Sequence, residues 1–175
     1  MLTQPIVLPE DGRQSETARE VVRGTRRLLR ARNIATVTEL VLADGRRPDI
    51  VGMGLDGSIT IVEVKSSIAD FRADKKWHHY RAFCDHLYFA IPVTLPVAVM
   101  PDETGIIVTD GYGAEVVRDA LPAKLAPATR RAMMIRFAQA AADRLHALAF
   151  LNVAAAFLVT AAAVSYTHLT LPTKA

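Results

Sequence analysis

Residues 47–65, RPDIVGMGLDGSITIVEVK, decide the fold that we expect for this chain. The stretch holds two apolar runs, 47–54 and 59–65, separated by the turn residues Asp56-Gly57-Ser58. Branched aliphatic residues dominate the second run, as is typical of a strand buried on both faces. Pro48 suits the start of a strand, where its missing N–H is tolerated. The stretch therefore predicts a β-hairpin whose second strand lies inside a sheet.

Three charged residues mark the open end of this hairpin, with Asp49 in the first run and Glu63 and Lys65 in the second. Side chains two residues apart on a strand point the same way, so Glu63 and Lys65 share a face. A two-residue turn would pair Asp49 with Val64 and put Asp49 on the opposite face. A three-residue loop, residues 56–58, would pair Asp49 with Lys65 and bring all three groups to one face. A functional site here therefore requires an odd-length loop or a bulge.

Glu39 is a fourth candidate for this site. It is the only charge in residues 35–42, ATVTELVL, whose β-branched residues predict a strand. The turn residues Asp44-Gly45 would bring Glu39 back to within one residue of pairing with Asp49. An edge salt bridge at the end of a hairpin is the alternative interpretation. A carboxylate and an amine at the end of a buried strand, however, cost free energy unless they are used.

Carboxylates and a lysine in this arrangement suit phosphodiester chemistry. Two carboxylates can hold a hard divalent cation such as Mg²⁺, and a lysine beside them can orient a water or stabilise a phosphate oxygen. The sequence therefore predicts a hydrolytic site built around Asp49, Glu63 and Lys65, with Glu39 beside them.

The rest of the chain predicts helices and strands in alternation around the hairpin. Residues 15–32 carry apolar side chains at helical spacing, with Ser15 as a candidate N-cap. Residues 67–83 predict a second helix, and the strand after it should return parallel to residues 59–65. The other predicted elements are strands at 86–91, 106–109 and 114–118 and an alanine-rich helix at 129–148.

Basic residues are unevenly distributed. Six arginines crowd the first predicted helix, where a solvated helix face is one interpretation and phosphate contact by a few of them is the other. Four further basic residues flank the candidate site in sequence and are candidate DNA contacts: Arg46, Arg47, Lys75 and Lys76.

The 175 residues are 51% apolar and 22% charged, a globular composition with enough chain for one domain. The net charge of +3 says little about partners. Cys84 is the only cysteine, which excludes an intrachain disulfide and a multi-cysteine zinc site and fits a reducing cytoplasm. Residues 1–14 show neither a basic region nor an apolar run of a signal peptide. We therefore expect a cytoplasmic location.

Four segments follow from composition and pattern. Residues 1–14 predict an irregular lead-in, residues 15–148 the main domain, and residues 149–163 an apolar, alanine-rich helical extension. Alanine is nearly indifferent to lipid, so we expect this extension to pack as a helix rather than to cross a membrane. Residues 164–175 resemble a translated sequencing adapter, and we expect them to be artefactual.

Asp49 followed by Glu63-Val64-Lys65, on a helix–strand–strand–strand–helix–strand framework, resembles the PD-(D/E)XK, or restriction-endonuclease-like, nuclease superfamily. Three longer runs are more specifically similar to the MmcB family of bacterial DNA-repair endonucleases. They are RRPDIVGM (46–53), VEVKSSIADFRADKKWHHYRAFCDHLYFAIP (62–92) and GIIVTDGYGAEVVR (105–118). The resemblance covers residues 15–148.

The resemblance implies an α/β fold with an αβββαβ core, in which helices flank a central mixed sheet and a C-terminal helix follows. It implies that Asp49 and Glu63 bind Mg²⁺ or Mn²⁺ together with the backbone carbonyl of Val64. Lys65 would orient or help deprotonate the attacking water, and Glu39 would be a further acidic ligand.

The implied function is metal-dependent endonucleolytic hydrolysis of DNA in bacterial repair, in association with the nucleoid. A catalytically silent DNA-binding or scaffolding domain of the same fold is the alternative. DNA is the expected partner, a homodimer or a repair-protein partner stays open, and no membrane partner is expected.

Overall fold

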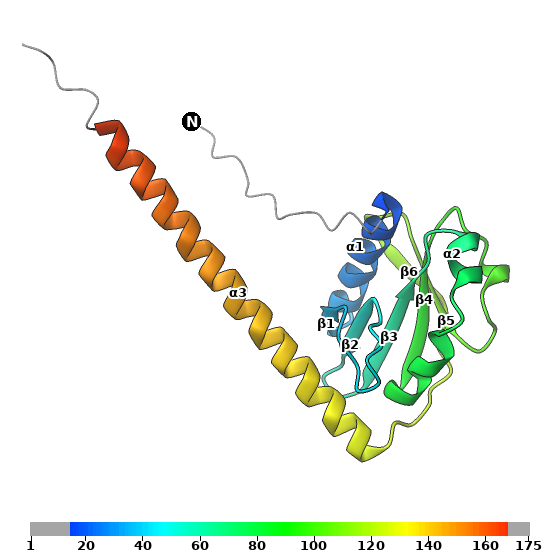
Figure 1. Ribbon diagram of the computed structural model, residues 1–175. Helices are drawn as coiled ribbons and strands as arrows, with labels where there is room; N and C mark the ends of the chain where they lie inside the picture. Colours follow the sequence, from blue (N-terminus) through cyan, green and yellow to red (C-terminus); the bar gives the residue numbers. More distant parts are fainter. Residues whose placement is uncertain (1–14, 168–175) are drawn as a thin grey trace, which may run out of the picture. The chain divides into compact units, whose positions relative to one another are not determined.

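A six-stranded sheet in the order β1-β2-β3-β4-β5-β6 forms the centre of the computed structural model (Figure 1). The pairs β3–β4 and β4–β5 are parallel and the other three neighbouring pairs are antiparallel, so the sheet is mixed. The strands are β1 (Ala35–Thr38), β2 (Ile50–Met53), β3 (Ile59–Val64), β4 (His86–Pro92), β5 (Gly105–Thr109) and β6 (Ala114–Arg118). The predicted pairing of the first three strands and the parallel return after β3 are confirmed. The strands predicted at 106–109 and 114–118 are present as β5 and β6, which pair as a hairpin.

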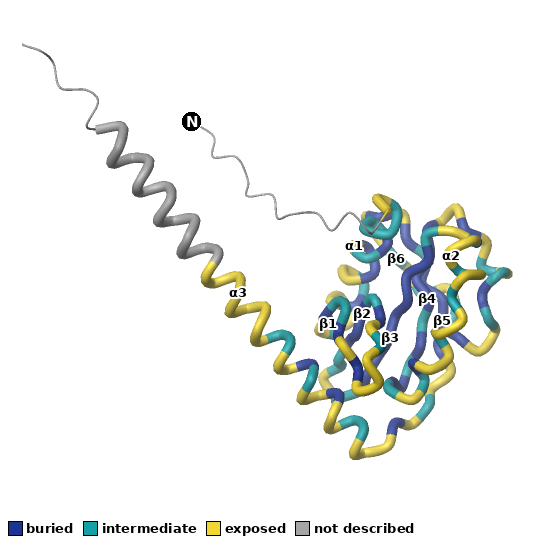
Figure 2. Tube along the Cα trace, in the orientation of Figure 1, coloured by how far each residue is buried: buried dark blue, intermediate teal, exposed yellow. Residues whose placement is uncertain are grey.

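Helices cover both faces of this sheet, as expected for a mixed α/β fold. On one face, Val21 and Leu29 of the first helix pack against a cluster that includes Ile50, Val62 and Ala90. On the other face, the segment after β3 packs against Phe89. The helices are α1 (Glu16–Ala31), α2 (Ile68–Ala73) and α3 (Pro127–Thr167), with the short 3-10 helices η1 (Trp77–Phe83) and η2 (Val97–Val99). β3 and β4 form the buried centre (Figure 2).

The structure describes the backbone of residues 15–167 and the side chains of residues 15–150. The chain divides into two compact units, residues 1–137 and 138–175. The first unit holds the entire sheet. The predicted lead-in, residues 1–14, lies outside the described residues, and so does residue 168 onward of the predicted artefactual tail. The predicted helix 129–148 is longer than expected, because α3 continues without a break through the predicted extension. No helix among the described residues is both long and apolar enough to cross a membrane.

Helix α1 lies close to the β5–β6 hairpin because Gly24 has no side chain. A Cβ at this position would clash with the hydroxyl of Thr109. The apolar stripe predicted for this helix is confirmed, with Val21, Thr25 and Leu29 buried. Gly24 lowers intrinsic helix stability but permits this close approach.

Two predicted strands are shorter in the structure. The run 35–42 is extended only to Thr38, because Glu39 adopts a left-handed backbone conformation with φ 49°. The run 47–54 is a ladder strand only from Ile50, which fits the absence of a donor N–H at Pro48. The buried character of Ile59–Val64 is confirmed at every position.

The single helix predicted for residues 67–83 is wrong. Ser67 caps α2 as predicted, since its hydroxyl accepts a hydrogen bond from the N–H of Asp70. The helix then ends at Asp74, whose backbone is extended, and the chain resumes as η1. The side chain of Asp74 bonds to Lys65 and to the N–H of Lys76, two partners that a continuous helix would not offer together.

Asp85 connects the starts of β3 and β4 to the segment that leads into α3. Its carboxylate accepts hydrogen bonds from the N–H groups of Ile59 (2.7 Å) and Leu125 (3.1 Å) and two from the guanidinium of Arg130 (2.7 Å each). Burial alone would raise the pKa of Asp85, but these bonds lower it to about 2, below the ordinary 3.8. A buried carboxylate whose lone pairs are all used in this way stabilises the fold only while it is ionised.

The stability provided by Asp85 should therefore depend on pH. Because its folded-state pKa is depressed, its contribution is fully present above about pH 4 and is lost as the pH falls toward 2. We expect Asp85→Asn to lower the free energy of unfolding by about 2 kcal/mol at pH 7 and to change little at pH 2. Urea denaturation at both pH values measures this. Asp102→Asn, at an exposed carboxylate, is the control. An equal loss at both pH values would contradict the prediction.

Candidate functional site

The β2–β3 register brings Asp49 and Glu63 opposite each other. Ile50 pairs with Val62 and Met53 with Ile59, so the ladder continues to Asp49 and Glu63. The N–H of Asp49 donates to Oε1 of Glu63 (3.2 Å), and Oδ2 of Asp49 accepts from the N–H of Val64 (2.7 Å). The two carboxylates are therefore held together by the backbone of both strands.

The register differs from both registers considered for the sequence. The loop comprises residues 55–57 rather than 56–58, and the N–H of Gly54 bonds to the carbonyl of Ser58 (2.9 Å). Gly57 takes the left-handed conformation (φ 77°) that this loop needs. The loop has three residues, so the required odd length is confirmed, and Asp49 keeps the same face as Glu63. Its partner, however, is Glu63 and not Lys65.

Lys65 follows β3 and is buried together with Glu63. Its Nζ donates to Oδ2 of Asp74 at 2.7 Å and lies 3.7 Å from Oε2 of Glu63. Burial would lower the pKa of Lys65, but the hydrogen bond to Asp74 and the charge of Glu63 more than offset it, and the pKa is raised. The pKa of Asp74 is lowered correspondingly by its bonds to Lys65 and Lys76, which outweigh its own desolvation. Lys65 is therefore a buried ammonium group held by two carboxylates.

The Asp49–Glu63 pair favours protonation or a cation. Burial, followed by the charge of Asp49, raises the pKa of Glu63 to about 8, even with Lys65 nearby. Burial also raises the pKa of Asp49, although the N–H of Val64 opposes this rise. Two carboxylates that share a buried site cannot both stay ionised without compensation. A bound divalent cation would supply that compensation and displace protons.

A pocket of about 340 Å³ opens over these groups. Asp49, Glu63, Val64 and Lys65 line it on the side of the sheet. The first turns of α1 and the segment that enters α2 complete its wall with Ser15, Ala18, Val22, Ser66 and Asp70. The site is thus a concave surface at the end of β3, open to a substrate.

Two acidic residues of this site were not predicted from sequence. Asp70, in the first turn of α2, lines the pocket, with Oδ2 accepting a hydrogen bond from the N–H of Ser66 (3.1 Å). Asp74, directly after α2, accepts a hydrogen bond from Lys65. The two lie four residues apart, one helical turn, shortly after Glu63-x-Lys65. That spacing alone does not distinguish them from capping or surface residues, so the sequence offered no specific signal for their place in the site.

Glu39 lies beside Asp49 in the backbone, and its carboxylate lies near Arg47. The N–H of Glu39 donates to the carbonyl of Asp49 (3.0 Å), so the two residues are direct neighbours across β1 and β2. The Glu39 side chain is half exposed and its nearest cation is Arg47, at 3.9 Å. Glu39 does not line the pocket.

The four candidate DNA contacts lie around the site without lining the pocket. Arg46 pairs with Asp44 at 2.6 Å, and Arg47 lies near Glu39. Lys75 and Lys76 are exposed in the short break between α2 and η1, directly after Asp74.

The donor set at Asp49 and Glu63 fits Mg²⁺ as this ion is commonly held. Among the residues that the structure describes, no three His, Cys, Asp or Glu side chains are grouped so as to hold a metal ion. Mg²⁺ in phosphoryl-transfer sites, however, often takes one or two carboxylates and fills its other positions with waters and substrate phosphates. Val64, whose carbonyl is the third expected ligand, lines the same pocket.

Comparison with known proteins places this geometry in a family. The family model of the DNA repair protein MmcB-like matches residues 7–152. The chain belongs to the MmcB-like family of DNA repair proteins. Among solved structures it is similar to the SPO1766 protein of unknown function from Silicibacter pomeroyi, at 42% identity and a TM-score of 0.74. That match covers 77% of this chain and 92% of the other. No curated protein matches. Membership of this family indicates a role in DNA repair.

The two facing carboxylates predict that a bound divalent cation stabilises the fold. We expect Asp49→Asn to raise the melting temperature in EDTA, corresponding to about 0.5–1 kcal/mol, because it removes the buried repulsion. The wild type should gain about 1–3 kcal/mol from Mn²⁺ or Mg²⁺ at ten to a hundred times Kd, and the variant should gain almost nothing. Thermal unfolding with EDTA or metal measures both effects. Glu115→Gln, at an exposed carboxylate of β6, should behave like wild type. Equal metal stabilisation of Asp49→Asn would contradict the site.

Proposed function

We propose that this MmcB-like protein is a metal-dependent deoxyribonuclease of the PD-(D/E)XK type that hydrolyses phosphodiester bonds in DNA. The observation that carries the proposal is the pair of facing buried carboxylates, Asp49 and Glu63, in an open pocket with the ammonium of Lys65 beside them. Membership of a DNA repair family supplies the substrate class. In this proposal Glu39 and Asp70 add negative charge near Asp49, as their effect on its pKa indicates.

Each residue has a defined part in the proposed reaction. Asp49, Glu63 and the carbonyl of Val64 hold Mg²⁺ or Mn²⁺, which when bound supplies a Lewis acid and a lowered pKa for a bound water. The raised pKa of Lys65 keeps it protonated at neutral pH, so it donates hydrogen bonds and does not accept the proton of the nucleophile. It orients the attacking water and stabilises negative charge that develops on the phosphate oxygens. This narrows the role expected from sequence, in which Lys65 could also deprotonate the water.

Cleavage assays test the proposal directly. The wild type should cut at least one substrate among single-stranded, duplex, nicked and flapped DNA in Mg²⁺ or Mn²⁺, and should be inactive in EDTA. Asp49→Ala and Lys65→Ala should each lower the rate by about 10²–10³-fold or more, because each removes a charge from the reacting phosphate's surroundings. Lys124→Ala, at an exposed lysine, is the control. Metal-dependent cutting that survives both substitutions would exclude this site. DNA binding without cutting under every condition would assign the chain to the catalytically silent class.

Asp74 should help to keep the pKa of Lys65 high without contacting DNA itself. Asp74→Asn keeps an oxygen acceptor for Nζ but removes the charge that helps to hold the pKa of Lys65 up. We expect a rate loss of about tenfold and an alkaline limb of the pH–rate profile at lower pH, because Lys65 then loses its proton sooner. The KM for DNA should not change. In a Lys65→Ala background the same substitution should have no further effect. A uniform loss at all pH values would indicate a purely structural role.

A further inference from the structure

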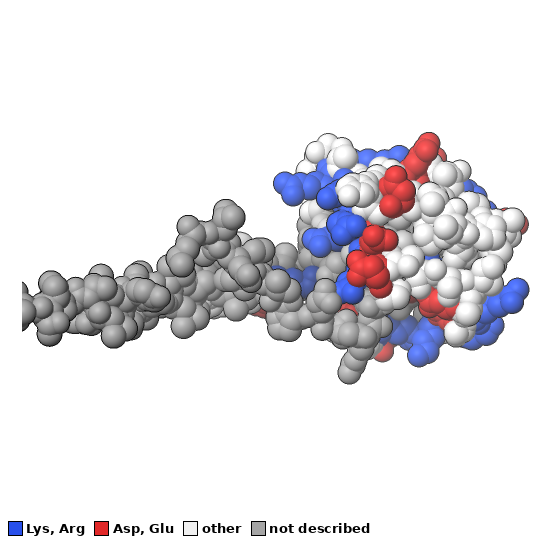
Figure 3. Space-filling model, turned by 90° about the horizontal axis from the view of Figure 1, so that it is seen from above, with Lys and Arg blue, Asp and Glu red and all other residues white. Residues whose placement is uncertain are grey.

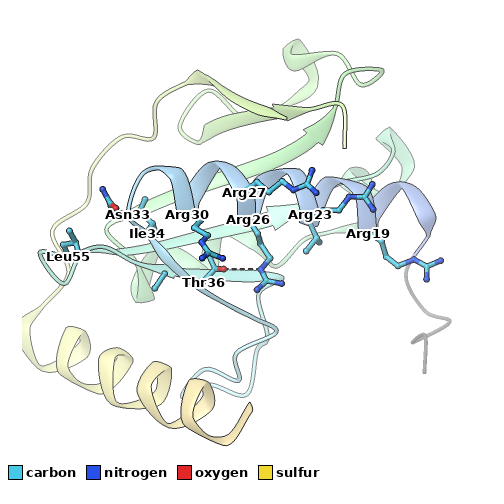
Figure 4. A pocket seen from close by; sticks show the side chains of 11 residues that line it. Arg19, Arg23, Arg26, Arg27, Arg30, Asn33, Ile34, Thr36 and Leu55 are labelled. Atoms are coloured by element: carbon cyan, nitrogen blue, oxygen red, sulfur yellow. Dashed lines mark hydrogen bonds between the residues drawn. The ribbon is translucent and has the colours of Figure 1, made fainter. Parts of the chain in front are cut away.

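A second, larger pocket lies along α1. Its volume is about 870 Å³, and Figure 4 shows its side chains. One wall comes from α1, and the other comes from β1 and the residues that precede it, together with Leu55 of the β2–β3 loop. We call this pocket the arginine groove, because five arginines of α1 line it: Arg19, Arg23, Arg26, Arg27 and Arg30.

The arginines follow the length of the helix. The spacing of Arg19, Arg23, Arg26 and Arg30 is four, three and four residues, which keeps them on one side of α1. At a rise of about 1.5 Å per residue, this row is about 16 Å long. Phosphates of one DNA strand follow each other every 3.4 Å or so along a duplex axis, so a row of this length spans several of them. Guanidinium groups match phosphate oxygens in charge and in bidentate geometry.

Three of these charges have no acidic partner among the described residues. Arg26 donates to the hydroxyl of Thr36 (3.2 Å) and Arg27 to the carbonyl of Tyr112 (3.1 Å), both neutral acceptors. Arg30 is exposed, and no carboxylate of the described residues lies within ion-pair distance of it. Positive charge concentrated in a groove without compensation attracts a polyanion.

The other two arginines form exposed ion pairs on their own helix. Arg19 pairs with Glu16 at 2.8 Å and Arg23 with Glu20 at 3.7 Å. Such exposed pairs contribute little to stability, so a phosphate can replace the carboxylate at low cost. Figure 3 shows basic and acidic side chains in neighbouring patches on one face of the described region.

The arginine groove and the Asp49–Glu63 pocket share a lining residue on α1. Val22 lines both pockets. Ala18, about one turn before Val22, and the N-cap Ser15, about two turns before it, line the carboxylate pocket. Four of the five groove arginines lie after Val22, toward the C-terminal end of the helix. Because α1 contributes to both pockets, a strand bound along this helix would contact residues that line each of them.

We infer that the arginine groove binds the sugar–phosphate backbone of the DNA strand whose phosphodiester bond lies at the Asp49–Glu63 pocket. The inference rests on the proposed function for the identity of the target bond. The DNA contact itself is independent of catalysis. Arg26 and Arg30 carry it most directly, since both are exposed and line the groove without acidic partners.

DNA binding measured without cleavage tests the groove. Fluorescence anisotropy of full-length protein on labelled 20-nucleotide single strands and 20-base-pair duplexes is recorded in EDTA over a range of salt concentrations. We expect Arg26→Gln/Arg30→Gln to weaken binding at least tenfold at about 0.1 M salt. The slope of log K against log salt should fall by about 1.8 on duplex or about 1.4 on single strands, for two lost phosphate contacts. The control Lys124→Gln/Arg131→Gln removes the same charge from exposed positions outside the groove and should bind like wild type.

The outcomes separate this inference from the proposed reaction. Loss of binding by the groove variant, with binding retained by Asp49→Asn, supports the groove whether or not any variant cuts DNA. Equal weakening by the groove and control variants would overturn it, because net charge alone would then explain binding. Wild-type affinity in the groove variant, or failure of the wild type to bind either DNA, would overturn it as well. Circular dichroism of each variant verifies that the fold is intact.

Discussion

The pairing of β2 with β3 is the constraint on which the rest of this structure depends. A three-residue loop fixes the register, and the register decides that Asp49 faces Glu63. A slip of one residue would turn Asp49 to the face on which α1 packs, where it would meet an apolar cluster. The hairpin therefore has to hold two like charges together against their repulsion. Backbone N–H groups from both strands do this by donating to each carboxylate.

The environment of Lys65 follows from the burial of Glu63 next to Asp49. An ammonium group buried next to one carboxylate is poorly compensated when that carboxylate tends to be protonated. Asp74 provides the second carboxylate, and to reach Lys65 it ends α2 early. The electrostatics of the site thus determine local secondary structure, and a helix is shortened so that a buried cation stays charged. The buried like charges of Asp49 and Glu63 work against stability, as is common where groups are positioned for a ligand.

Much of the fold could be predicted from residue patterns alone. The six strands and the parallel return after β3 were accessible because branched aliphatic runs and turn residues are local signals. The parallel pairing of β4 with β5 was not predicted. The early ends of β1 and α2 could not be predicted. β1 ends at the left-handed backbone of Glu39, which depends on backbone context. α2 ends where Asp74 bonds to Lys65, a partner nine residues away in sequence. The charged core of the site, Asp49, Glu63 and Lys65, was predicted, but the exact partner of Asp49 depends on which loop residue takes a positive φ. Asp70 and Asp74 were missed because capping and surface roles explain such residues equally well in sequence.

Gly24 gives α1 a mechanical property. Its backbone lies so close to Thr109 that no side chain fits between them, which restricts how far the helix can shift against the β5–β6 hairpin. Val22, at the boundary of the two pockets, and Arg30, near the far end of the arginine groove, are separated by about 12 Å of rigid helix. A helix held in this position keeps a fixed distance between the two pockets. If a nucleic-acid strand binds at one end of this helix, the phosphodiester bond at the other end lies a constant number of nucleotides from the bound phosphates. The position of that bond would then depend on distance along the strand and not on base sequence.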